Sequence, residues 1–193
     1  TYMREWLALY ESKSGERGIF NRQAAKKQAS LNGRRDEEQD FGCNPCSEII
    51  LRPYQFCNLS EVVVRASDTQ QSLTEKVRLA TILGTFQSTL TDFKYLRKIW
   101  RNNTEEERLL GVSLTGIMDN SMMSGKSAHL GMKIAATLNA LKEQAIETNA
   151  AMAEQLGVPQ SAAITCVKPS GTVSQLVDSA SGIHARHNPY YIR

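Results

Sequence analysis

Residues 41–50, FGCNPCSEII, hold the side chains in this sequence that are best suited to chemistry. Pro45 disfavours helical geometry at Asn44, so the segment is predicted to be extended or turning. In an extended chain alternate side chains share one face, which would align Asn44, Cys46 and Glu48. Convergence of the three on one small ligand requires curvature, as at the tip of a loop. Such a loop can present an amide, a thiol and a carboxylate base to the same ligand.

The pair Cys43 and Cys46 also fits the C-x-x-C spacing of a redox or zinc site. Zinc normally takes four ligands, and the two remaining cysteines, Cys57 and Cys166, form no second pair of this kind. A thiol oxidoreductase is a further interpretation, although the expected thioredoxin-like context is absent. The spacing alone therefore leaves a redox or metal-binding module open.

Residues 168–174, KPSGTVS, form a second candidate segment, because they follow a predicted strand and can open a helix. Backbone N–H groups at such a turn, assisted by hydroxyls, can bind an anion. The segment is not a Walker loop, because the spacing is too short and no lysine follows its last glycine. His184 and His187 lie in a polar stretch and are interpreted as surface residues, so no metal ligand is predicted.

The elements that position these groups follow from the hydrophobic periodicity. Helices are predicted at 2–12, 73–100 and 127–156, and a helix cap with an acidic first turn at 104–107. Residues 12–40 show no hydrophobic periodicity, and within them 34–40 are predicted to form a solvated loop. Strands are predicted at 109–117 and 162–167. Strands that alternate with long helices favour an α/β architecture.

Composition excludes several classes of protein. Hydrophobic residues make up 41% and charged residues 22% of the 193 positions, as in an ordinary globular protein. The net charge of +3 is too small to indicate a nucleic-acid or membrane surface. No run reaches the roughly 18 apolar residues of a membrane span, and no signal peptide is visible. A cytoplasmic location without nucleic-acid or membrane partners is therefore expected.

Both ends of the sequence look cut. There is no initiator methionine, and the sequence stops in the strand-like run YYIR at 190–193. We therefore expect a longer parent polypeptide.

Several segments, in consistent order, resemble ribonucleotide reductases. They are SGERGIFN at 14–21, NPCSEI at 44–49, CNL at 57–59, LLGVSLTGIMD at 109–119, KPSGTVS at 168–174, and the stretch from GIH at 182–184 to YYIR at 190–193. Such collinearity is far more specific than any one motif. The sequence is most similar to the adenosylcobalamin-dependent branch (class II), and within it to the monomeric enzymes that act on ribonucleoside triphosphates.

Two other branches fit less well. The anaerobic glycyl-radical branch lacks the carboxylate that Glu48 supplies. The iron-dependent branch uses a tyrosine pair near its C-terminus, but the residues that follow Tyr190 and Tyr191 are similar to the cobalamin branch. A branch with a diphosphate substrate or a separate iron radical subunit stays as the alternative, ahead of the C-x-x-C module.

The resemblance implies a role for each side chain of the cysteine loop. Cys46 would become a thiyl radical with the help of adenosylcobalamin and abstract the ribose 3′-hydrogen. Glu48 would take the proton of the 3′-hydroxyl, and Asn44 would orient the sugar hydroxyls. Cys57 would be one of two reducing thiols, with its partner upstream of this sequence. Cys43 departs from the small residue usual in the family and is expected to remain a thiol.

The resemblance also implies partners. Ser170, Gly171, Thr172 and Ser174 would hold the substrate phosphates, and Lys168 is a further candidate. A ribonucleoside triphosphate, a thioredoxin-type dithiol reductant and a deoxynucleotide effector bound outside these residues would be the ligands of a monomeric enzyme. Cys166, inside an apolar run, is interpreted as a buried small hydrophobe.

The fold implied by the resemblance is a ten-stranded α/β barrel made of two parallel halves, with the cysteine loop threaded through its centre. Residues 1–193 would form part of that one catalytic barrel domain, with an active-site loop at 41–60 and a phosphate loop at 168–174. Because much of the barrel would be missing, the isolated polypeptide is expected to be poorly folded and inactive.

Overall fold

The computed structural model describes residues 1–14, 18–31, 33–125, 131–188 and 190. Its helices are α1 (Tyr2–Ser12), α2 (Arg22–Ser30), α3 (Gln70–Gln87), α4 (Lys98–Glu107), α5 (Gly131–Leu156) and α6 (Thr172–Leu176). Its strands are β1 (Gly42–Cys43), β2 (Ile50–Leu51), β3 (Asn58–Val63) and β4 (Leu110–Thr115), and a 3-10 helix follows at Ile117–Asp119. The architecture is mixed α/β, as predicted, and it does not close into a barrel within the described residues.

The centre of the fold is the parallel pair β3 and β4, in register from Asn58 opposite Leu110 to Val63 opposite Thr115. The segment 162–167, predicted as a strand, runs along the other edge of β4 but forms only one isolated bridge, Val112 with Thr165. The ladder is interrupted there because the N–H groups of Leu110 and Val112 donate to the consecutive carbonyls of residues 163 and 164. The edge segment therefore advances by one residue where β4 advances by two, and this extra residue on β4 breaks the regular pairing.

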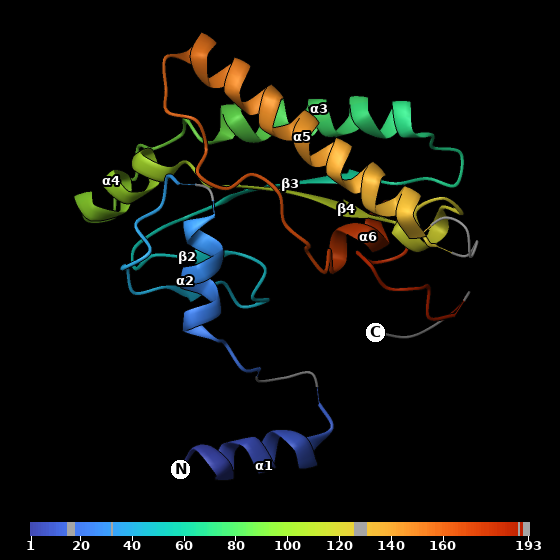
Figure 1. Ribbon diagram of the computed structural model, residues 1–193, viewed down its shortest axis with the longest axis horizontal. Coiled ribbons are helices and arrows are strands. Elements are labelled where there is room, and N and C mark those ends of the chain that lie inside the picture. The colour runs from blue at the N-terminus through green and yellow to red at the C-terminus, as the bar shows by residue number, and fades with distance from the viewer. Residues whose placement is uncertain (15–17, 32, 126–130, 189, 191–193) are drawn as a thin grey trace.

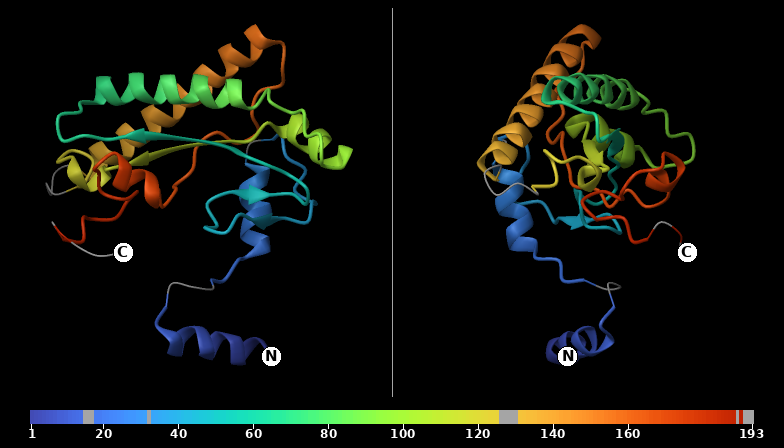
Figure 2. Two further views of the ribbon diagram at one scale, coloured as in Figure 1. Left: turned by 180° about the vertical axis from the view of Figure 1, so that it is seen from behind. Right: turned by 90° about the vertical axis from the view of Figure 1, so that its right-hand side faces the viewer.

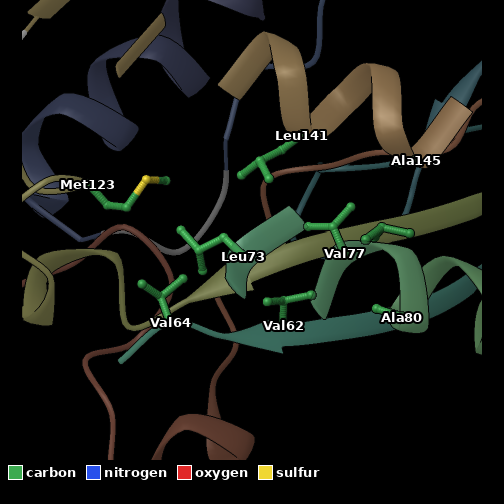
Figure 3. Packing of buried hydrophobic residues seen from close by; sticks show 9 residues of the cluster. Val62, Val64, Leu73, Val77, Ala80, Met123, Leu141 and Ala145 are labelled. Atoms are coloured by element: carbon green, nitrogen blue, oxygen red, sulfur yellow. The ribbon is translucent and has the colours of Figure 1, made fainter. Parts of the chain in front are cut away.

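The two faces of this pair carry different side chains, because residues alternate along a strand. One face packs against α3 and α5 and forms the main core (Figure 3), which includes Val62, Val64, Leu73, Val77, Ala80, Val112, Leu141 and Ala145. The opposite face carries Leu59 and packs with Ile49, Leu109, Ala162 and Cys166. Figures 1 and 2 show α3 and α5 on one side of β3 and β4, with α2, β2 and α6 on the other.

Helix α2 (Arg22–Ser30) lies within the range 12–40, where the sequence shows no periodicity and no helix was predicted. Asn21 caps the helix, since its Oδ1 accepts a hydrogen bond of 3.0 Å from the Ala24 N–H. Ala25 and Ala29, one turn apart, are buried against Phe41. Two alanines among charged neighbours are too weak an apolar stripe to be recognised in sequence.

The single helix predicted at 73–100 is two helices in the structure. Helix α3 ends at Gln87, where the hydroxyls of Ser88 and Thr89 donate to carbonyls of its last turn. Helix α4 then begins at Lys98 and includes Thr104, so the predicted helix start at 104–107 is also wrong.

The other predicted elements agree with the structure where it describes them. Helix α1 and strand β4 are found as predicted, and α5 ends at Leu156 as expected. Residues 127–130 of the predicted helix, and residues 191–193 of the final strand-like run, lie outside the described residues. Within the described residues, no helix is both long and apolar enough to span a membrane.

Candidate active site

The segment 41–50 forms a hairpin in which β1 and β2 pair antiparallel, with Cys43 opposite Ile50. The turn at its tip is closed by a hydrogen bond of 2.9 Å from the Ser47 N–H to the Asn44 carbonyl. The side chain of Asn44 reinforces the turn, because its Oδ1 accepts a hydrogen bond of 3.0 Å from the Ile49 N–H. The curvature that the sequence required is therefore supplied by a tight turn, not by an extended strand.

Cys46 lies in this turn and is exposed. All four cysteines are free thiols, so Cys43 and Cys46 are not joined in a disulfide. The Cys43 sulfur lies 3.4 Å from the Ser47 hydroxyl. Cys43 thus remains a thiol, as expected from the sequence.

Glu48 lies two residues beyond Cys46, and its side chain is only 2% exposed. Its Oε1 is 3.4 Å from the Lys168 Nζ, while its Oε2 is buried and has no hydrogen-bond partner among the described residues. Glu48 lines a cavity of about 380 Å³ that also contacts α2 and residues 160–165. A buried carboxylate with one unused oxygen can accept a proton or a hydrogen bond from a ligand.

Cys57 directly precedes β3 and packs in the same apolar cluster as Cys166. Burial raises the pKa of Cys57, and the negative charge of Glu48 raises it further, while Lys168 acts in the opposite direction. Burial and then Glu48 likewise raise the pKa of Cys166 to about 12. Both cysteines are therefore protonated thiols at neutral pH. Cys166 packs against apolar side chains but is only partly buried, so its interpretation as a buried small hydrophobe holds only in part.

The segment 168–174 leads into the short helix α6, as the sequence indicated. Ser170 donates a hydrogen bond of 2.9 Å to the Glu61 carboxylate, and Ser174 donates one of 2.8 Å to the Gly171 carbonyl. Ser170 and Gly171 both have positive φ angles. Thr172 is exposed at the start of α6. Of the three predicted hydroxyl groups, the one on Thr172 is thus the one presented to solvent.

Two contacts bring the cysteine hairpin, β3 and the 168–174 segment together. Lys168 reaches Glu48 on the hairpin, and Ser170 reaches Glu61 on β3. Glu61 was not predicted as a site residue. In the structure its Oε1 is buried and has no hydrogen-bond partner among the described residues. Side chains alternate between the two faces of a strand, so Glu61 lies on the same face as Cys57, four residues before it. This relationship identifies Glu61 as a site residue only once the strand register is known.

Metal binding finds no support in the geometry. Among the residues that the structure describes, no three His, Cys, Asp or Glu side chains are arranged to hold a metal ion. The zinc interpretation of Cys43 and Cys46 would therefore need ligands from elsewhere.

Comparison with known proteins gives relatives along nearly the whole chain. The sequence is 28% identical to the adenosylcobalamin-dependent ribonucleoside-triphosphate reductase of Lacticaseibacillus paracasei, over 97% of this chain and 28% of the relative. It is 30% identical to the enzyme of the same name from Lactobacillus acidophilus, over 93% of this chain and 27% of the relative. No family model matches the sequence.

The predicted resemblance to adenosylcobalamin-dependent ribonucleotide reductases is confirmed. The fold agrees, because a crystal structure of a B12-dependent (class II) ribonucleotide reductase matches 79% of this chain with a TM-score of 0.61 at 22% identity. The match covers 23% of that reductase. The chain thus spans little more than a quarter of the length of the curated relatives named above.

Proposed function

We propose that the chain forms the cysteine-loop part of an enzyme that reduces ribonucleoside triphosphates to 2′-deoxyribonucleoside triphosphates for DNA synthesis. The observation that carries this proposal is the arrangement of the hairpin. Cys46 is exposed at its tip. Two positions later the Glu48 carboxylate is buried, and only one of its two oxygens has a partner among the described residues. The similarity to named ribonucleoside-triphosphate reductases supports the same reaction.

In the proposed reaction Cys46, as a thiyl radical, takes the hydrogen atom from the ribose 3′-carbon and returns it to that carbon after the 2′-carbon has been reduced, which regenerates the thiyl radical. Sulfur suits this exchange because an S–H bond is close in strength to the activated C–H bond. Glu48 accepts the 3′-hydroxyl proton through a carboxylate oxygen. The Oδ1 of Asn44 already accepts the Ile49 N–H, so its amide NH₂ group is the part that donates to a sugar oxygen.

Cys57 is proposed to supply one of the two reducing thiols. Its raised pKa keeps the hydrogen on sulfur, which suits a thiol that must deliver it. The bond between the 2′-carbon and its oxygen breaks, and the oxygen leaves as water. Two thiols lose two hydrogens in total and become a disulfide, which an external dithiol of the thioredoxin type then reduces. The second thiol is proposed to come from a part of the parent protein upstream of this sequence.

Adenosylcobalamin is the proposed cofactor, and when bound it supplies the radical equivalent that oxidises the Cys46 thiol. The exposed position of Cys46 fits a group that reaches the sulfur from outside the hairpin. None of the described residues is assigned to hold the cofactor.

The substrate triphosphate is proposed to lie at the start of α6. The Thr172 hydroxyl is exposed there, and backbone N–H groups near Gly171 can donate to phosphate oxygens. Ser170 and Ser174 shape this turn through their own hydrogen bonds. Residues 1–193 are proposed to be part of one barrel domain in a cytoplasmic, monomeric enzyme, whose deoxynucleotide effector binds elsewhere in the parent protein.

Nucleotide reduction by the full-length protein tests this function. The assay compares ribonucleoside triphosphates with diphosphates, in the presence of a dithiol, with and without adenosylcobalamin. Reduction of triphosphates that requires the cobalamin is expected. Activity without cobalamin, or with diphosphates alone, would assign the protein to another branch of reductases. Absence of reduction under all conditions would contradict the proposal.

A further inference from the structure

Lys168 opens the proposed phosphate loop, yet its ammonium group faces the cysteine hairpin. Its Nζ lies 3.4 Å from the Oε1 of Glu48, a residue 120 positions away in the sequence. The Lys168 side chain is 25% exposed and that of Glu48 is 2% exposed. The amino group therefore contacts a buried carboxylate and not the exposed start of α6.

The backbone around Lys168 is held from two sides. Its N–H donates a hydrogen bond of 3.1 Å to the hydroxyl of Ser113 on β4. On the other side its carbonyl oxygen packs so closely on Gly182 that a Cβ added there would lie 2.7 Å from it. Ser181 also donates a hydrogen bond of 2.8 Å to the carbonyl of Pro169. The contact with Glu48 thus starts from a fixed backbone position.

Other positively charged side chains lie near Glu48, but among the described residues none of them forms an ion pair with it. Arg34, Arg35 and Lys142 line the same cavity. Arg35 is already paired with Glu107. Among the ion pairs of the described residues, Glu48 takes part only in the one with Lys168.

We propose that Lys168 is a positioning residue for Glu48 and not a phosphate ligand. By binding Oε1 it balances the buried charge and fixes the carboxylate, so that the unpartnered Oε2 is the oxygen that meets the substrate hydroxyl. A buried charge is costly unless it is paired, so loss of the ammonium group would disturb both the charge and the orientation of Glu48. This inference rests on the proposed function.

The two roles of Lys168 differ in kinetics. A lysine that binds phosphate contributes to substrate binding, so its loss raises KM. A lysine that positions the general base contributes mainly to the chemical step, so its loss lowers kcat. A correctly placed general base accelerates a reaction by about 10²–10⁴-fold. If Glu48 is misplaced, part of this rate enhancement is lost.

The test uses the full-length protein with Lys168→Met and Lys168→Arg, assayed for kcat and KM with a ribonucleoside triphosphate. Lys76→Met is the matched control, because Lys76 also pairs with a largely buried carboxylate, that of Asp68, outside the proposed site. We expect kcat of Lys168→Met to fall by about 10²-fold with KM changed by less than about threefold. Lys168→Arg keeps the positive charge and is expected to recover most of kcat, and Lys76→Met to retain the wild-type kcat.

A raised KM with unchanged kcat in Lys168→Met would make Lys168 a phosphate ligand and overturn the inference. Wild-type kinetics in Lys168→Met, or an equal loss of kcat in Lys76→Met, would also overturn it. Failure of the wild-type protein to reduce any nucleotide would instead contradict the proposed function itself. The two failures are therefore distinguishable in the same set of assays.

Discussion

Arg35 and Glu107, 72 positions apart in the sequence, form a bidentate ion pair with both N–O distances at 3.0 Å. Their side chains are 3% and 2% exposed, and Gln55 donates a hydrogen bond to the same carboxylate. The Arg35 guanidinium also lies 4.8 Å from the ring centroid of Phe41, the residue that leads into β1. This contact fixes the approach to the cysteine hairpin against the end of α4.

Breaking this pair is expected to destabilise the protein strongly. Arg35→Met leaves the Glu107 carboxylate buried without its main partner, so the free energy of unfolding should fall by about 3–5 kcal/mol. The double variant Arg35→Met/Glu107→Leu removes both charges and should lose less than Arg35→Met alone. Urea unfolding of the full-length protein measures Arg35→Met, Glu107→Leu and the double variant. A double variant that loses the sum of the two single losses would contradict the coupling between the residues.

Gly111 is expected to be intolerant of any side chain. A Cβ there would collide with Leu59 and come within 3.2 Å of the Ile49 Cδ1 and the Cys166 Sγ. Gly111→Ala should therefore lower the free energy of unfolding by about 1–3 kcal/mol and, by displacing Ile49, lower activity.

The matched control is Gly84→Ala in α3, where the new Cβ would meet Leu110 at an ordinary 3.5 Å. Alanine is about 0.5–1 kcal/mol better than glycine inside a helix, so this variant should be as stable as the wild type or more so. The same urea titration compares the two variants. Equal stability of Gly111→Ala and Gly84→Ala would refute the packing argument.

Glu48→Gln should make two half-buried thiols, Cys57 and Cys166, more reactive. The Glu48 charge raises the pKa of Cys57 and of Cys166, so removal of that charge lowers both pKa values. At a fixed pH near 8 a larger fraction of each cysteine is then thiolate, the form that iodoacetamide alkylates. Mass spectrometry of digested samples gives the labelling rate of each cysteine.

Glu38→Gln is the control for this labelling, because the Glu38 side chain is 81% exposed and pairs with Lys26. It should leave both labelling rates unchanged. Slower labelling of Cys57 in Glu48→Gln than in the wild type would show that the carboxylate acts on the thiol in the opposite sense.

Acid should weaken the contact between Asp119 and Arg186. Burial alone would raise the pKa of Asp119, but hydrogen bonds from Arg186 and from the Ala180 N–H outweigh it and hold the pKa below its ordinary value. A carboxyl group with a lowered folded pKa stabilises the protein above its unfolded pKa of about 3.9. That stability is lost as the pH falls through the folded value.

Asp119→Asn removes this titration. The variant should be less stable than the wild type at pH 7, and the difference should shrink as the pH falls below about 4. Urea unfolding of the full-length protein across this range measures the difference. If the difference in the free energy of unfolding between Asp119→Asn and the wild type grew as the pH fell, Asp119 would not be held in its charged form by these contacts.

The sequence predicted the strongly periodic elements of the fold and missed those whose ends depend on local contacts. Strand β4 is an apolar run that alternates, and α5 has a long stripe closed by Gly157 and Pro159, so both were found. The break between α3 and α4 depends on hydroxyls that bond back to helix carbonyls, as Ser88 does. Such bonds leave no clear mark in hydrophobic periodicity.

The candidate site was predicted from local sequence only in part. The turn at Pro45 followed from residues close together in the chain, whereas the thiol state of Cys43 was expected from the resemblance to ribonucleotide reductases. The contacts of Lys168 with Glu48 and of Ser170 with Glu61 join residues more than 100 positions apart. Composition and spacing hold no information on such pairs, because they depend on how β3, β4 and the hairpin pack.

Nucleotide reduction by Cys46→Ser in the full-length protein, with adenosylcobalamin, a dithiol and a ribonucleoside triphosphate, tests the proposed role of Cys46 directly. Cys43→Ser is the matched control, since Cys43 is a second thiol of the same hairpin. We expect Cys46→Ser to lose all detectable reduction, because a serine hydroxyl does not replace the thiyl radical, and Cys43→Ser to stay active. Undiminished reduction by Cys46→Ser would show that Cys46 does not carry the radical.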